Sequence, residues 1–84
     1  MMEAFEAMSE YLNTFGYSTF ISETNTNVAP ILSFKFLRDV FITFSFKENK
    51  WKVVHITDNI KVATLFDTPM QVITCIITRR YKEI

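Results

Sequence analysis

The segment from residue 31 to residue 57 constrains the fold most, because its apolar and polar side chains alternate with a period of two over most of its length. Successive side chains of a β-strand point to opposite faces, so this alternation predicts strands with one buried face. Short connections at residues 37–39 and 47–49 divide the segment into three strands. Such short connections join antiparallel neighbours, and the segment therefore predicts a β-meander.

The lengths of these connections decide which side chains share a face. Each connection ends in Asp or Asn, residue types that tolerate the left-handed conformation closing a three-residue hairpin loop. Such loops place Ile42 opposite Phe34 on one side and opposite Val54 on the other. We expect the resulting apolar face to be the core, with the members Leu32, Phe34, Phe36, Val40, Ile42, Phe44, Phe46, Val54 and Ile56.

The opposite face in this register is polar but contains aromatic side chains. Its members are Ser33, Lys35, Phe41, Thr43, Ser45, Lys47, Trp51, Val53 and His55. A two-residue turn at residues 48–49 is the alternative. That turn would put Trp51 and Val53 in the core, because a shift of one residue exchanges the two faces of a strand. We predict the first register.

The residues before the meander predict a helix, a strand and a loop. Residues 2–15 repeat apolar side chains at helical spacing and stop at Gly16, a residue type common just after the end of a helix. Residues 17–23 are rich in aromatic and β-branched side chains, which favour a first strand. Residues 24–30 are polar and end in Pro30, so we expect a loop there.

The residues after the meander predict a further element and a second helix. Residues 61–66 suit either a short fifth strand or an irregular crossing. Thr68 suits a helix cap, Pro69 suits the first helical position, and Gln71 completes a capping box. Residues 69–82 carry an apolar stripe at helical spacing, which predicts a helix. Their many β-branched side chains leave an added strand as the alternative.

Together these elements predict a single small α+β domain over residues 1–84. We expect a two-layer sandwich, in which an antiparallel four- to five-stranded meander sheet carries the N- and C-terminal helices on one face, in the order α-β-β-β-β-(β)-α. The chain has 84 residues and is 49% hydrophobic, so it can bury one hydrophobic core and fold as one domain.

Composition argues against several classes of protein. The single cysteine excludes an internal disulfide, and no apolar run approaches the roughly 20 residues that span a bilayer. The acidic N-terminal residues do not resemble a signal peptide, so we expect a cytoplasmic protein. One glycine cannot make a phosphate-binding loop, and one histidine with a distant cysteine cannot make a metal site. We therefore expect no enzyme activity, no cofactor and no metal.

The charge is unevenly distributed although it sums to zero. Residues 1–30 contain four glutamates and no lysine or arginine, whereas residues 31–57 contain five basic and two acidic side chains. An acidic first element therefore accompanies a mildly basic sheet. This pattern suits solvated surfaces, electrostatic self-association or an anionic partner.

We predict one binding surface on the polar face of the sheet. Its residues are Lys35, Phe41, Lys47, Trp51, Val53 and His55. Aromatic side chains between lysines can stack single-stranded bases while the lysines neutralise phosphates. An apolar sheet surface is equally what a homodimer buries. The competing interpretation places Trp51 in the core through the other register.

These patterns favour a non-enzymatic protein-interaction module that acts as a homodimer or docks on a protein partner through the open sheet face. Weak single-stranded nucleic-acid binding on the same face is the alternative, and small-molecule binding between helices and sheet is the second. The order helix, three strands, helix resembles that of double-stranded-RNA-binding domains. Those domains open the last helix with a lysine cluster, where this chain has Thr68, Pro69, Met70 and Gln71.

Overall fold

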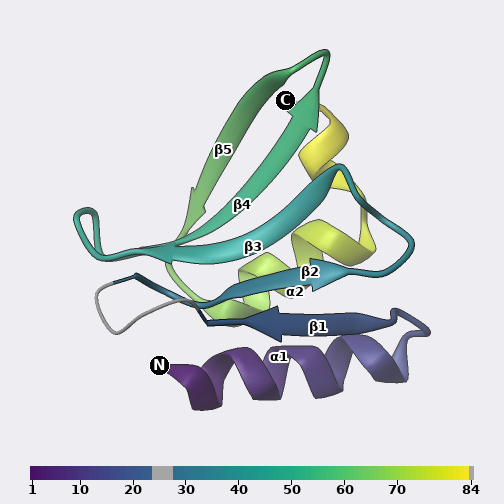
Figure 1. The fold of residues 1–84 in the computed structure, drawn as a ribbon, viewed down its shortest axis with the longest axis vertical. Helices are drawn as coiled ribbons and strands as arrows, with labels where there is room; N and C mark the ends of the chain where they lie inside the picture. Colours follow the sequence, from purple (N-terminus) through teal and green to yellow (C-terminus); the bar gives the residue numbers. More distant parts are fainter. Residues whose placement is uncertain (24–27, 84) are drawn as a thin grey trace.

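The computed structural model describes residues 1–23 and 28–83 and confirms the predicted α+β architecture (Figure 1). The elements are α1 (Met2–Thr14), β1 (Thr19–Ser22), β2 (Ile31–Phe34), β3 (Val40–Ser45), β4 (Lys50–Thr57), β5 (Ile60–Phe66), α2 (Pro69–Ile77) and the short 3-10 helix η1 (Arg80–Glu83). The five strands form an antiparallel sheet in the order β1-β2-β3-β4-β5. Residues 24–27 of the predicted loop lie outside the described residues.

Both helices cover the same face of the sheet, so the fold has two layers. α1 lies along β1, and α2 passes behind β2 and β3 (Figure 1). The core between the layers comprises Phe5, Met8, Leu12, Leu32, Phe34, Val40, Ile42, Trp51, Val53, Val72, Ile73, Cys75, Ile76 and Tyr81. Each helix contributes the apolar stripe that its sequence predicts, and the uncovered face of the sheet meets solvent.

The end of α1 follows from Gly16. This residue has a φ of +90°, a conformation that side chains bearing a Cβ rarely adopt. Its N–H donates to the Asn13 carbonyl at 3.0 Å, and the Tyr17 N–H donates to the Leu12 carbonyl at 3.1 Å. These two bonds make a Schellman motif, which stops the helix and turns the chain back toward the sheet. Tyr17 then packs edge-on against Phe34.

The start of α2 confirms the predicted capping box. The Gln71 N–H donates to the Thr68 hydroxyl at 3.2 Å, and the Thr68 N–H donates to the Gln71 side-chain carbonyl at 3.1 Å. The helix ends at Ile77, five residues before the predicted end at residue 82. Arg79 has a φ of +59° and redirects the chain into η1. Tyr81 still reaches the core, from the 3-10 helix.

The connection between β2 and β3 is longer than predicted. Ile42 pairs with Leu32, and not with Phe34, so residues 35–39 form a five-residue loop. This shift of two residues keeps the faces of both strands but removes Phe36 from the predicted core, where it is instead 78% exposed. Backbone bonds hold both ends of the loop, since the Lys35 N–H donates to Ser18 and the Asp39 carbonyl accepts from Ile56.

The predicted register between β3 and β4 is wrong. Trp51 and Val53 lie in the core, as in the alternative, but the connection has four residues and not the two that the alternative assumed. Trp51 pairs with Phe44 and Val53 pairs with Ile42, across a four-residue connection at residues 46–49. Phe46 becomes part of the turn and is 56% exposed.

The burial of Trp51 explains this outcome. Its ring packs against Phe5 and Phe44 with centroid separations of 5.1 Å in both cases. An indole ring buries roughly 150–250 Å², more than the valine that the predicted register would place on this face. Val54 and Ile56, predicted on the core face, lie on the opposite face of β4, where Val54 is nevertheless buried. The preference for burying the largest side chain therefore overrides the preferred turn length.

Candidate interaction surfaces

The structure does not bring together the six residues of the predicted binding surface. Trp51 is 7% exposed and Val53 is 1% exposed, both within the core. Phe41 lies on the uncovered face, whereas Lys35 and Lys47 are exposed beside loops at different ends of the strands. Lys35 instead holds its ammonium group 5.4 Å from the centroid of the Phe36 ring. Three of the six residues, Trp51, Val53 and His55, face the helices, so the six do not form one surface.

His55, the sixth of these residues, also faces the helices. Its Nε2 lies 3.2 Å from the Asp39 carboxylate, and its ring meets Tyr81 edge-on at 5.2 Å. With Nε2–H donated to the carboxylate, Nδ1 is the free nitrogen, and it is buried without a partner among the described residues. The contact between Asp39 and His55 joins the loop at residues 35–39 to β4.

The other buried titratable groups favour their neutral forms. Burial raises the pKa of the Tyr81 hydroxyl, and the nearby Asp39 charge raises it further. Burial also raises the pKa of the Cys75 thiol, although a backbone hydrogen bond from Tyr81 and the Arg80 charge oppose that shift. A protonated, buried thiol is a poor nucleophile. Within residues 1–23 and 28–83, no three His, Cys, Asp or Glu side chains lie close enough to hold a metal ion.

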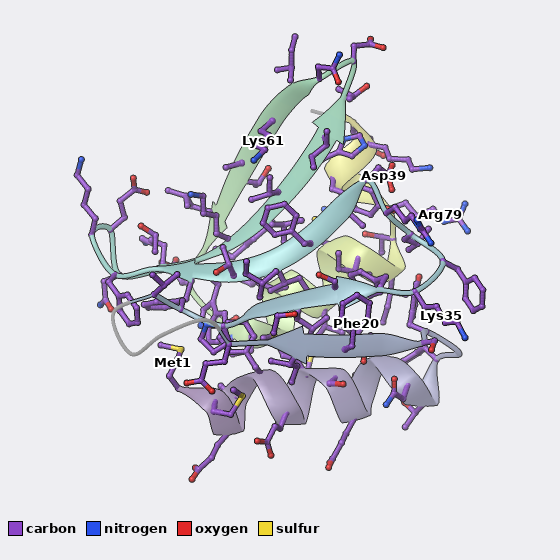
Figure 2. All side chains as sticks on the ribbon, viewed as in Figure 1. Met1, Phe20, Lys35, Asp39, Lys61 and Arg79 are labelled. Carbon is purple, nitrogen blue, oxygen red and sulfur yellow. The ribbon has the colours of Figure 1, made fainter. Side chains whose placement is uncertain are left out.

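The sheet face that carries no helix is called the open face. Pairing places on it Phe20, Ile31, Ser33, Phe41, Thr43, Lys52, Val54, Ile56, Lys61, Ala63 and Leu65. Figure 2, drawn from this side, shows Phe20 and Lys61 over the sheet. Phe20 is 53% exposed and Leu65 is 41% exposed. The open face is thus a mixture of apolar side chains and lysines.

A hollow of about 350 Å³ indents one end of the open face. Phe20 and Phe41 line it from the strands, and Lys35, Leu37 and Arg38 line it from the loop at residues 35–39. The two aromatic rings therefore lie near cationic side chains. The sequence predicts this combination for the polar face of the sheet, but the second ring beside Phe41 is that of Phe20 and not that of Trp51.

A larger groove, of about 620 Å³, lies on the helix side of β5. Its walls include Thr64 and Phe66 of β5, Met70 and Thr74 of α2, and Arg80 of η1. α2 contacts both β4 and β5, and η1 contacts β4. The groove lies where these helices leave part of the inner face of β5 uncovered. This volume lies in the range of sites that hold small molecules, roughly 300–1,000 Å³.

β5 is an uncovered edge of the sheet. All seven of its residues pair one-to-one with β4, and its other side meets no strand among the described residues. Proteins commonly protect such edges with proline, a bulge or several charges. β5 has neither proline nor bulge, and its only charge is Lys61. Ile60 and Leu65 are 62% and 41% exposed.

The turn before β5 shows which of its backbone groups face outward. Asp58 and Asn59 have φ values of +49° and +66°, which identifies a two-residue type I′ turn. Thr57 and Ile60 flank this turn as a hydrogen-bonded pair, and pairs along an antiparallel ladder alternate between bonded and non-bonded. The N–H and C=O groups that point away from β4 therefore belong to Lys61, Ala63 and Leu65.

Sequence reasoning missed this edge and the groove beside it. The sequence leaves residues 61–66 as either a short strand or an irregular crossing. Their role depends on whether they form the last strand of the sheet and on where the helices end. Comparisons with protein-family models, curated proteins and solved structures found no match. In the part of the chain that the structure describes, no helix is long and apolar enough to cross a membrane.

Proposed function

We propose that this protein is a small, non-enzymatic protein-interaction module that acts as a homodimer, with the free edge of β5 as its contact. The observation that supports the proposal is the seven-residue edge strand, which carries a single charge and whose outward backbone groups pair with no other strand in the part of the chain that the structure describes. An added strand would bond to these groups, and main-chain bonds of this kind supply affinity in strand-addition complexes.

A contact along β5 needs buried apolar surface in addition to its hydrogen bonds. Three outward residues offer six backbone groups, and each hydrogen bond contributes about 0.5–1.5 kcal/mol net. Association costs roughly 4–15 kcal/mol in lost rigid-body freedom, so the hydrogen bonds alone do not hold two chains together. The half-exposed apolar side chains beside the edge, Ile60 and Leu65, provide the additional burial. We expect a reversible dimer of moderate affinity.

Sedimentation equilibrium across micromolar concentrations tests the proposal. The wild-type chain is expected to shift from monomer to dimer as its concentration rises. Ala63→Lys places a charge in the middle of the edge and is expected to weaken the dimer by roughly tenfold or more. Ala7→Lys adds the same charge at an exposed position on α1 and is expected to leave the dimer unchanged. A monomer at every concentration contradicts the proposal.

The open face supports a second candidate function, weak binding of single-stranded nucleic acid. Phe20 and Phe41 present aromatic rings beside Lys35, and Lys52 and Lys61 add positive charge to the same face. Rings can stack on bases of any sequence while lysines contact the phosphates. This arrangement replaces the one predicted around Trp51, because that side chain is in the core.

Fluorescence anisotropy with a labelled oligothymidine tests this second function. Affinity is expected to fall with rising salt, because bound phosphates release counterions. Phe41→Ala is expected to cost about 1–3 kcal/mol per stacked base, whereas Phe46→Ala removes an exposed ring from the β3–β4 turn and is the matched control. Binding without a salt dependence, or equal effects of the two variants, excludes the function.

A further inference from the structure

We infer that two copies of this chain pair antiparallel along β5 with a two-fold axis beside Ala63, so that each copy supplies a wall to the other's groove. The inference rests on the homodimer proposed above and specifies its register. Three features of β5 support this register: the direction of its backbone groups, the order of its side chains, and the groove on its helix side.

Backbone direction restricts the allowed registers. Outward groups occur only at Lys61, Ala63 and Leu65, and hydrogen-bonded pairs must join outward residues of the two copies. Ala63 is the middle residue of Ile60–Phe66, so an axis beside it pairs all seven residues and forms six hydrogen bonds between outward groups. Moving the axis by one residue leaves five residues paired and four such bonds.

The side chains agree with the register that Ala63 centres. On the helix side, Phe66 lies next to the partner's Ile60, and Thr64 lies next to the partner's Val62. Apolar and β-branched neighbours of this kind stabilise antiparallel pairs. On the open face, Lys61 lies next to the partner's Leu65, whose side chain its aliphatic stem can cover. The two Lys61 ammonium groups are therefore not opposite each other, and no like charges meet.

The same register joins the two grooves. Phe66 and Thr64 form the strand wall of the groove, and α2 and η1 form the wall above β4. The remaining side is open toward the free edge of β5, which is where the second copy adds its own β5. The partner's Ile60 then lies beside Phe66 and continues the strand wall of the groove. The dimer thereby closes the side of each groove that is open in a single chain. Met70, which lines the groove and is 55% exposed in one chain, then faces the enclosed space.

Single-cysteine cross-linking of the full chain tests the register. Each variant carries Cys75→Ala, which removes the buried thiol, together with one of Lys61→Cys, Ala63→Cys or Leu65→Cys. Ala63 and the partner's Ala63 would form a hydrogen-bonded pair beside the axis, and the Cα atoms of such a pair are about 5.5 Å apart. This distance lies within the roughly 4.4–6.8 Å that a disulfide spans. At positions 61 and 65 equivalent residues lie four positions apart along the strands, or about 13 Å.

We expect mild oxidation to produce covalent dimer from Ala63→Cys and little from the other two variants. Sedimentation of the same samples under reducing conditions separates the register from the dimer. A dimer whose cross-linking is strongest at position 61 or 65, or absent at all three, overturns this inference and leaves the homodimer standing. A monomer under reducing conditions overturns both. Circular dichroism of each variant establishes that the sheet is intact.

Discussion

The two edges of the sheet differ in length and in what lies beside them. β1 has four residues and β5 has seven. α1 runs beside β1 (Figure 1), and the Ser9 hydroxyl shares a 2.5 Å hydrogen bond with Thr19. Thr19 also donates to the Asn13 side chain at 3.2 Å. β5 has no such neighbour on its outer side among the described residues. Within residues 1–23 and 28–83, the chain therefore covers the edge at β1 and leaves the edge at β5 uncovered (Figure 1).

This difference shows that coverage, and not strand sequence, separates the two edges. Both strands combine β-branched and aromatic side chains with few charges, which favours pairing in each case. The N-terminal helix is placed where it covers the β1 side, while the C-terminal helix follows β5 and folds back over the centre of the sheet. No described element remains to cover β5, and the dimer proposed above would cover it with a second chain.

Removing the cover of β1 has the largest expected effect. Phe5 is fully buried and packs against Trp51, so Phe5→Ala should lower the free energy of unfolding by about 3–5 kcal/mol. Phe20→Ala, on the exposed side of β1, should cost under about 1 kcal/mol. Chemical denaturation measures both changes. If the two variants lost equal free energy of unfolding, the packing of α1 on the sheet would not be a main source of stability.

Proline substitutions in β5 compare residues whose backbone groups point toward β4 with residues whose backbone groups point away from it. Val62 bonds to β4, so Val62→Pro removes a ladder hydrogen bond and leaves a carbonyl of β4 unpaired, which should cost about 1–3 kcal/mol or more. Ala63 directs its N–H outward, so Ala63→Pro should disturb the monomer less and weaken the dimer. Denaturation and sedimentation separate these effects. A larger loss of stability from Ala63→Pro would invert the assignment of outward groups.

The covered edge allows a smaller test. Ser9→Ala removes the hydrogen bond between α1 and β1 and should lower stability by about 0.5–1.5 kcal/mol. Ser22→Ala alters an exposed hydroxyl on the same strand and should have almost no effect. Amide hydrogen exchange should also quicken in β1 for Ser9→Ala alone. An unchanged exchange rate would show that the contact is incidental to the closure of this edge.

Local signals allowed the end of α1 and the start of α2 to be predicted from sequence, whereas the end of α2 was not predicted correctly. Gly16 and the pair Thr68 and Gln71 act through bonds to backbone groups only a few residues away. The register of β4 depends on a competition that sequence does not resolve. A three-residue turn and a four-residue turn both suit Asn49, whose φ is +53°, and the burial of Trp51 decides between them. Loop length is therefore a tertiary property here.

The candidate site was less predictable than the fold for the same reason. None of the six predicted binding residues belongs to β5, although residues 61–66 were considered as a strand. Whether a strand is an exposed edge depends on where all the other strands and helices lie. The sequence of the strand alone therefore does not identify the edge as a binding site. Lys35 and Phe41 keep a place on the second candidate surface, because their side of the sheet does not depend on the register that was wrong.

The smallest effect at neutral pH is expected where the helical cover ends, at Tyr81. Its hydroxyl is buried with no hydrogen-bond partner among the described residues, and burial together with the Asp39 charge raises its pKa. A raised pKa means that folding favours the neutral phenol, so its contribution is complete below the ordinary tyrosine pKa of about 10 and is lost as pH rises through the folded value. Wild-type stability should therefore fall in alkaline solution.

Tyr81→Phe should reduce that alkaline loss and change stability little at neutral pH, because removing an unpaired buried hydroxyl leaves no orphaned partner. Tyr11→Phe, at an exposed position of α1, controls for the loss of a phenol from the covered half. Urea denaturation of the three proteins at neutral and alkaline pH measures the difference. The buried Cys75 thiol, whose pKa is also raised, should leave a residual alkaline loss in Tyr81→Phe. If Tyr11→Phe protected the fold at high pH as well as Tyr81→Phe does, the alkaline sensitivity would come from general charge repulsion, and the end of the cover over β4 would not be its source.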